Sequence, residues 1–283
     1  MGKEKRHTSL SFCIFEVTMF SKFQLAKKYL QYFFTASSGK GHGIHSPFVF
    51  DLIKNVLRNK KENDWYLIIE TARQKLLKQK AEIEVNDLGA GSGLIKTNKR
   101  AVADIARSSL KPKKFSQLLY RMVNYYQPKT ILELGTSLGI TTSYLAAADP
   151  NAKVYTIDGS PAIANIAQIT FDRFDLKNIE LITGDFNDIL PGLLSRLQTI
   201  DLAFIDGNHR KGPTLDYFQQ LVKHSAATSI LVFDDIHWSA EMEEAWGIIQ
   251  QHPSVTLTID LFFIGIVFLN PDFKIKQHFI IRF

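Results

Sequence analysis

The stretch TILELGTSLG, from Thr130 to Gly139, joins an apolar strand to a glycine turn and decides the fold. A Rossmann-type binding unit has such a turn, then a helix, then a second strand that ends in an acid. Downstream of Gly139 the chain supplies a helical segment and then the strand KVYTIDG, with Asp158 at its end. We therefore predict that Thr130 begins the first strand of a Rossmann-like sheet. The stretch lacks the middle glycine that admits a pyrophosphate, which disfavours NAD as the ligand.

A second glycine-rich stretch, VNDLGAGSG from Val85 to Gly93, lies upstream. No apolar strand ending in Asp or Glu follows it before the next predicted helix, so it does not meet the requirement for opening the sheet. Two interpretations of the loop from Gly89 to Gly93 stay open. It is either part of a substrate entrance or hinge, or an ordinary surface turn.

Short apolar strands alternate with helices from Pro128 onward, which predicts a mostly parallel sheet covered on both faces. Two later apolar segments are close enough to form an antiparallel hairpin, and the last segment alternates like an edge strand. The predicted strands lie at 130–136, 153–159, 178–185, 200–208, 229–236, 255–262, 263–270 and 273–283. The predicted fold class is α/β, with a Rossmann-like sheet, a terminal antiparallel hairpin and a helical N-terminal region.

The N-terminal region carries apolar residues at spacings of three and four, which predicts amphipathic helices. Ser46 followed by Pro47 is a helix start signal. The predicted helices lie at 19–35, 47–58, 64–83 and 113–126. We interpret residues 1–18 as a disordered extension, residues 19–127 as a helical cap that selects the substrate, and residues 128–283 as the ligand-binding domain.

Composition restricts the class of protein. With 45% hydrophobic and 22% charged residues, the chain has the composition of a globular protein. Its single cysteine, Cys13, allows no intrachain disulfide, which favours a cytoplasmic location. The apolar run from Leu261 to Leu269 has nine residues, whereas a membrane helix needs about 20. No membrane partner is expected.

Charge is divided unevenly along the chain. Residues 1–129 carry 24 Lys and Arg against 10 Asp and Glu, whereas residues 130–283 carry 10 against 18. The basic part could attract an anionic partner, or its lysines could simply lie on solvated helix faces.

Five short motifs, in this order and spacing, resemble class I S-adenosylmethionine-dependent methyltransferases, particularly the catechol O-methyltransferase-like group and its bacterial relatives. The resemblance covers about residues 130 to 270. The motifs are ELGTSLG, TIDGS, ITGD, AFIDGNH and VFDDIHW. The resemblance implies an enzyme that methylates an oxygen of a small molecule, with residues 128–283 as its methyltransferase domain.

The resemblance also implies which residues bind S-adenosylmethionine. Glu133 would meet the ammonium group of its methionine part, and the glycines of the first turn would let the backbone approach it. Asp158 would bind the ribose hydroxyls, and Asp185 would lie beside the adenine. The implied cofactor-binding residues are Glu133, Gly135, Thr136, Ser137, Gly139, Asp158, Gly184, Asp185 and Asp206.

Three carboxylates at strand ends, Asp206, Asp234 and Asp235, could hold Mg²⁺ or another divalent cation. The catechol-type group has Asn where this chain has Asp235. The alternative is that Asp206 contacts the cofactor and that Asp234 or Asp235 caps the next helix. The candidate catalytic residues are Asp206, His209 and His237. Either histidine could act as general base, or both could be plain hydrogen-bonding residues.

Two other functions stay open. An RNA-directed methyltransferase would use the basic N-terminal part with its aromatic residues Tyr29, Tyr32, Phe33 and Phe34, although no recognised RNA-binding motif is present. The second open function is that of a non-catalytic cofactor-binding protein of the same fold. The oligomeric state, including a homodimer, is not determined by the sequence.

Overall fold

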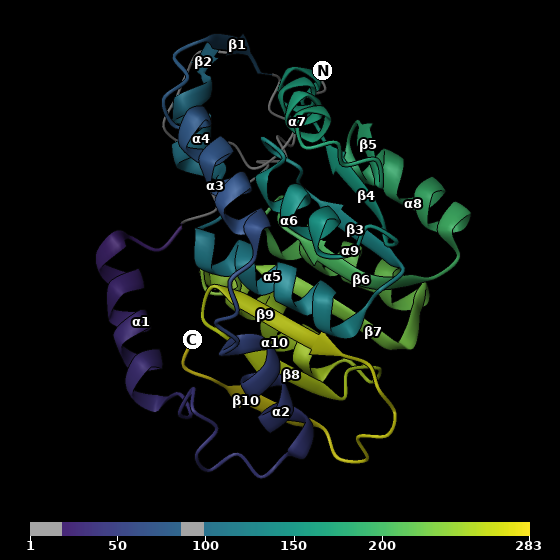
Figure 1. Ribbon diagram of the computed structural model, residues 1–283. Coiled ribbons are helices and arrows are strands. Elements are labelled where there is room, and N and C mark those ends of the chain that lie inside the picture. Colours follow the sequence, from purple (N-terminus) through teal and green to yellow (C-terminus); the bar gives the residue numbers. More distant parts are fainter. Residues whose placement is uncertain (1–18, 86–98) are drawn as a thin grey trace, which may run out of the picture.

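The computed structural model describes residues 19–85 and 99–283, and an eight-stranded sheet crosses the centre of this described part (Figure 1). In order across the sheet, the strands are β10 (Gln277–Ile280), β8 (Leu257–Asp260), β9 (Ile264–Phe268), β7 (Ser225–Asp234), β6 (Ile200–Ile205), β3 (Thr130–Leu134), β4 (Lys153–Asp158) and β5 (Ile179–Thr183). From β5 to β7 neighbouring strands are parallel, and β9 is antiparallel to both β7 and β8. The predicted sheet with its terminal hairpin is confirmed, and β10 is the predicted edge strand.

Side chains alternate between the two faces of the sheet and meet a separate layer of helices on each face. On β6, Leu202 and Phe204 pack on one face, and Ala203 and Ile205 pack on the other. The first face is covered by α5 (Lys113–Tyr126), α6 (Ile140–Ala148) and α7 (Pro161–Arg173). The second is covered by α8 (Phe186–Leu197), α9 (Lys211–Lys223) and α10 (Ala240–Gln251).

The N-terminal region is mainly helical, as predicted, and α1, α2 and α3 each begin after a residue whose side chain caps the helix. They are α1 (Lys22–Thr35), α2 (Pro47–Leu52) continued by the π-helical segment η1 (Ile53–Leu57), α3 (Asp64–Leu76) and α4 (Val102–Ser109). α1 begins three residues later than predicted, because the Ser21 hydroxyl accepts a hydrogen bond from the Gln24 N–H and so caps the helix there. Ser46 caps α2 as predicted.

The predicted helix over residues 64–83 is wrong in its last part. α3 ends at Leu76, and β1 (Glu82–Glu84) then pairs antiparallel with β2 (Lys99–Ala101). Glu84 lies opposite Lys99 in this ladder, and a pair of opposite charges favours the strand pairing. Local periodicity could not reveal a partner strand so far along the chain. The predictions for residues 1–18 and for the Gly89–Gly93 loop lie outside the described residues.

One buried cluster joins the N-terminal helices to the sheet. It includes Leu52 of α2, Leu118 of α5 and Ile131 of β3. The N-terminal segment also reaches the far sheet edge, where Ser37 forms a parallel bridge with Ile281 just beyond β10. The two parts of the chain therefore share one core. Across residues 19–85 and 99–283, no helix has the length and apolarity needed to cross a membrane.

Candidate active site

The turn after β3 lies at the edge of the sheet where the carboxyl ends of β3, β4, β6 and β7 meet. Gly135 has a φ angle of 106°, and a Cβ atom there would overlap the main-chain carbonyl of Asp206 beside β6. The N–H groups of Gly135 and Thr136 both donate to the Ile157 carbonyl, at 3.0 and 3.2 Å. Because glycine alone combines this φ with such a close approach, Gly135 lets the two strand ends lie against each other.

The rest of the turn is held by β4 and α7. Ser137 has a φ angle of 47°, and its N–H donates to Asp158 Oδ2 at 2.8 Å. Gly139 has a φ angle of 78°, and a Cβ atom there would lie 2.7 Å from the ring of Phe171. The turn is thus fixed before any ligand arrives.

Glu133 is fully buried at this edge. One carboxylate oxygen, Oε2, accepts hydrogen bonds from the hydroxyls of Thr142 and Thr156, the latter at 2.7 Å. The other, Oε1, has no hydrogen-bond partner among the described residues. Burial raises the pKa of Glu133 to about 8, the threonine hydroxyls lower it, and the charges of Asp206 and Asp158 raise it.

Asp158 and Asp185 both hold main-chain groups. Asp158 accepts from the N–H groups of Ser137 and Ser160, and thereby ties the end of β4 to the turn after β3. Asp185 accepts from the Asn187 N–H at 2.8 Å and caps α8, which is the ordinary role of an Asp in such a loop. A Cβ atom at Gly184 would lie 2.9 Å from Ile189.

A cluster of charged side chains lies beyond the ends of β6 and β7. One possible ligand atom each from Asp206, His209 and Asp234 lies within 4.8 Å of the other two. The Nε2 atom of His209 lies 3.7 Å from Asp206 Oδ1. Asp234 is 1% exposed, and its Oδ1 has no hydrogen-bond partner within the described part of the chain. Two predicted metal ligands therefore lie together, with His209 as the third member.

Lys111 belongs to this cluster and was missed by sequence reasoning. Its ammonium group forms an ion pair with Asp234 Oδ2 and lies 3.6 Å from Asp206 Oδ1. The connection from α4 to α5 carries it there, and the hydroxyl of Ser109, the last residue of α4, lies 2.7 Å from the Ser137 hydroxyl. Nothing in the run KPKK distinguishes Lys111 from the lysines of a solvated helix end.

Asp235 and His237 lie elsewhere than the predicted roles require. Asp235 has a φ angle of 52° and donates its N–H to the Phe263 carbonyl at 2.7 Å, and it is not part of the group around Asp206. His237 lies between Glu243 and Asp260, with ring nitrogens 2.9 and 2.8 Å from their carboxylates.

The surroundings of His237 favour its charged form. Burial, the largest influence, lowers the pKa of His237, but the hydrogen bonds and charges of Asp260 and Glu243 outweigh it and raise the pKa. A charged imidazole that donates from both nitrogens has no lone pair left to accept a proton. This placement argues against His237 as general base, and His209 is left as the histidine of the cluster.

Residues 132–236 match the methyltransferase domain family. This match spans the strands from β3 to β7, whereas Lys111 and His237 lie outside it. The chain is 36% identical over 148 residues to a catechol O-methyltransferase of Niastella koreensis, a match over 50% of this chain and 65% of the relative. It is also 32% identical over 112 residues to the human transmembrane O-methyltransferase, and this match covers 38% of each of the two chains. The chain thus spans less than two thirds of these relatives.

Solved structures share the fold at lower identity. The O-methyltransferase TomG of Streptomyces achromogenes, solved with SAM, has a TM-score of 0.54 and 18% identity, covering 74% of this chain and 91% of TomG. The methyltransferase PaMTH1 of Podospora anserina, solved with SAH, has a TM-score of 0.55 and 12% identity, and the match covers 80% of this chain and 97% of PaMTH1.

Proposed function

We propose that this protein transfers a methyl group from S-adenosylmethionine to an oxygen atom of a small molecule. The chain carries a class I methyltransferase domain that resembles catechol O-methyltransferases. The observation that carries this proposal is the buried, unpartnered Oε1 of Glu133 beside the Gly135 turn. A buried carboxylate oxygen without a partner is costly, and a ligand that brings an ammonium group removes that cost. S-adenosylmethionine carries such a group.

The other residues of the edge fit the same ligand. Besides Glu133 Oε1, the buried Ser160 Oγ and Asp234 Oδ1 lack hydrogen-bond partners within the described residues. Asp158, whose carboxylate oxygens accept the main-chain N–H groups of Ser137 and Ser160, would bind the ribose hydroxyls. Gly135, Thr136, Ser137 and Gly139 would hold the methionine part, and Gly184 with Asp185 would border the adenine.

The chemistry needs a proton acceptor beside the acceptor hydroxyl. Bound S-adenosylmethionine would supply a methyl group on a positive sulfur, so that the acceptor oxygen would bond to the methyl carbon while the carbon–sulfur electron pair stayed on sulfur. His209 takes the hydroxyl proton and releases it to solvent, and Asp206 orients the imidazole from 3.7 Å. Because the methyl donor is already reactive, close positioning supplies much of the rate.

A divalent cation does not fit the cluster as it is arranged. Asp206, His209 and Asp234 offer suitable ligand atoms, but the Lys111 ammonium already contacts both carboxylates, and Asp235 is outside the group. We therefore derive no step through a metal.

Calorimetric titration of the full chain with S-adenosylmethionine and S-adenosylhomocysteine tests the cofactor. Asp158→Asn should weaken binding about 10- to 100-fold through loss of a charged hydrogen bond. Asp172→Asn, a matched change on the exposed side of α7, should leave it unchanged. Absence of binding by the folded wild type at high micromolar ligand would sink the proposal.

Transfer itself is measured with catechol as the first acceptor, by mass spectrometry of the product. Turnover with any acceptor excludes the non-catalytic alternative. Four points stay predictions: a small-molecule acceptor, the substrate-selecting role of residues 19–127, a cytoplasmic location and a homodimer. The single cysteine, Cys13, supports the cytoplasmic location.

A further inference from the structure

We infer that Lys111 is the resident cation of this site, and that the protein therefore does its chemistry without a divalent metal. The statement about metal binding holds whatever reaction the site performs, whereas its catalytic part rests on the proposed function.

The position of the ammonium group carries the inference. Lys111 Nζ contacts Asp234 Oδ2 and lies 3.6 Å from Asp206 Oδ1, so it occupies the space between the two carboxylates that would ligate a metal. Its side chain is 10% exposed, and those of Asp206 and Asp234 are 16% and 0% exposed. A divalent ion binds carboxylate oxygens at about 2.0 to 2.6 Å, and it would have to take this same space against a buried positive charge.

Lys111 is held in place from behind by a buried arginine. Arg73 of α3 donates from Nη1 to the Lys111 carbonyl at 2.7 Å, and from Nη2 to the Ser116 hydroxyl at 3.3 Å. Arg73 is 6% exposed, and its Nε lies 2.9 Å from Glu70. Pro112 then restricts the backbone directly before α5 begins. A lysine held in this way is part of the site and not a surface side chain that has folded inward.

The third expected metal ligand, Asp235, does not belong to the group formed by Asp206, His209 and Asp234, which is an independent observation. Asp235 lies in the left-handed region, with its N–H bonded to the Phe263 carbonyl. The cluster thus holds two carboxylates and one histidine around a single resident positive charge, the Lys111 ammonium group.

The consequence for transfer concerns the acceptor oxygen. An ammonium group has three N–H donors, and the hydrogen bond to Asp234 uses one of them. Another can donate to the acceptor oxygen as His209 removes its proton, and so stabilise the developing negative charge that a metal would otherwise stabilise.

Metal binding tests the inference without reference to activity. The EDTA-treated full chain is titrated calorimetrically with MgCl₂ and with MnCl₂, and the wild type should show no binding up to millimolar concentration. Lys111→Met keeps the length of the side chain but removes the charge, and should gain at least tenfold in Mn²⁺ affinity through Asp206, His209 and Asp234. Lys113→Met, at the exposed first residue of α5, is the matched control.

The outcomes are separable. Micromolar Mg²⁺ or Mn²⁺ binding by the wild type overturns the inference, and so does a folded Lys111→Met variant that gains no affinity. If that variant does not fold, the wild-type titration still decides, and Lys111→Arg, which keeps the charge, should behave as the wild type does.

Methyl transfer supplies the second readout. EDTA should leave wild-type transfer unchanged, and Lys111→Met should reduce kcat about 100-fold. Loss of wild-type transfer on EDTA treatment, restored by Mg²⁺, would contradict the catalytic part. Absence of transfer under every condition counts against the proposed function and leaves the metal titration intact.

Discussion

A carboxyl group that is buried with too few hydrogen bonds holds its proton, and Glu133 is such a group. Burial is the main cause that raises its pKa to about 8, from 4.5. In the ligand-free protein this side chain is therefore largely neutral at pH 7, although an ammonium group binds best to the charged form. Cofactor binding must then release a proton below pH 8.

The affinity for S-adenosylmethionine should consequently rise with pH. Between pH 6 and 8 the Kd should fall by up to about tenfold per pH unit, and above pH 8 it should level off. Calorimetry at several pH values, in buffers of different ionisation enthalpy, measures both the Kd and the released proton. Glu133→Gln should bind more weakly and without this proton. A constant wild-type Kd with no buffer-dependent heat would contradict the role of Glu133.

Gly135 makes a prediction about backbone geometry at the same scale. Gly135→Ala should destabilise the fold by roughly 3 kcal/mol or more, because the added Cβ atom meets the Asp206 carbonyl and the φ angle is unfavourable for alanine. Gly247→Ala, in the middle of α10 with open space around it, should instead stabilise by about 1 kcal/mol. Urea denaturation of both variants gives the comparison. Equal stability of the two would refute this account of the turn.

At the scale of elements, His237 connects α10, β8 and α1. It bridges Glu243 of α10 and Asp260 of β8, and Glu243 also accepts from Lys28 of α1 at 2.9 Å. The Phe262 ring stacks on the imidazole at a centroid distance of 5.1 Å. Both carboxylates favour the imidazolium, which makes this junction between elements sensitive to pH.

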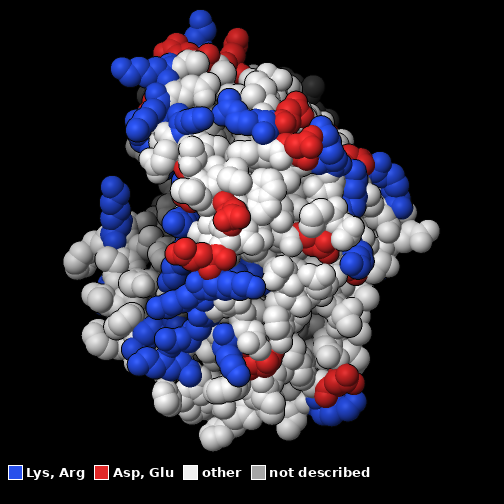
Figure 2. Space-filling model, viewed as in Figure 1, with Lys and Arg blue, Asp and Glu red and all other residues white. Residues whose placement is uncertain are grey.

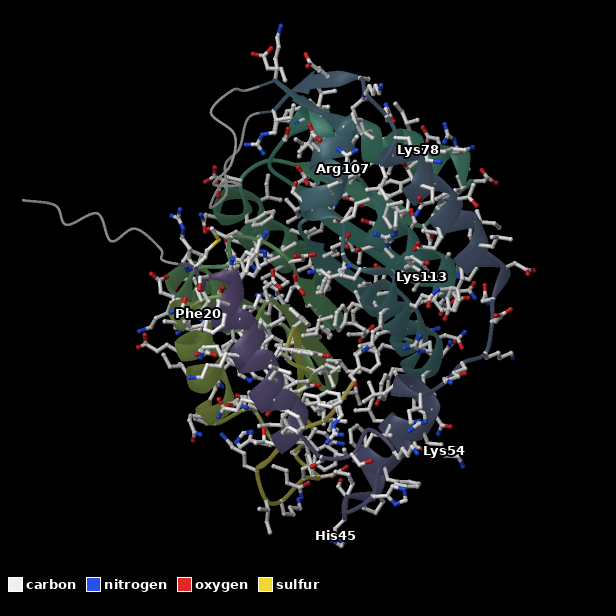
Figure 3. All side chains as sticks on the ribbon, turned by 90° about the vertical axis from the view of Figure 1, so that its left-hand side faces the viewer. Phe20, His45, Lys54, Lys78, Arg107 and Lys113 are labelled. Carbon is white, nitrogen blue, oxygen red and sulfur yellow. The ribbon has the colours of Figure 1, made fainter. Side chains whose placement is uncertain are left out.

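The sign of this sensitivity follows from the raised pKa of His237. Its stabilisation is complete below the unfolded pKa of about 6.5 and is lost as pH rises through the folded value. At pH 6, His237→Gln should lower the free energy of unfolding by about 2 kcal/mol, and the difference should shrink at alkaline pH. His45→Gln, in the exposed loop before α2, is the control (Figure 3). A wild-type to variant difference that grew with pH would contradict the charged bridge.

The helices could be predicted from a cap signal at Ser46 and from apolar periodicity over Lys113–Tyr126. Prediction failed at β1, because Glu82–Glu84 becomes a strand through pairing with Lys99–Ala101. The positions of Asp206 and Asp234 were predictable, since parallel strands end at one edge of a sheet. The side-chain partners of His237 were not, because they come from two other elements.

At the scale of the whole molecule, the uneven charge remains visible on the surface. Figure 2 shows a group of blue side chains at the lower left of the viewed face and further blue side chains, with red ones among them, along its upper rim. Turned by 90°, the molecule has Lys78, Arg107, Lys113 and Lys54 along one flank (Figure 3). The aromatic part of the RNA hypothesis is weaker, because Tyr29 and Tyr32 pack against Phe262.

RNA binding should therefore be weak and purely electrostatic. Fluorescence polarisation with a labelled single-stranded RNA should give a Kd in the micromolar range or weaker at 50 mM salt, and binding should disappear by 200 mM. Aromatic stacking would add a salt-insensitive contribution. Nanomolar affinity that survives 200 mM salt would favour an RNA acceptor instead, and replacement of the exposed Phe34 by alanine would show whether that side chain contributes.

The sequence by itself determined the sheet, the glycine turn that opens it and the acids at its strand ends. These features depend on neighbours in the chain, since strand alternation, a turn at Gly135 and an acid after each strand are local patterns. The tertiary structure alone decided that Lys111 lies between Asp206 and Asp234, that Asp235 stays outside their group and that His237 is paired on both sides. The physical reason is that these side chains meet partners from other elements, such as Asp234 for Lys111 and Asp260 for His237, which lie more than twenty positions away and are brought close only by the folding of the chain.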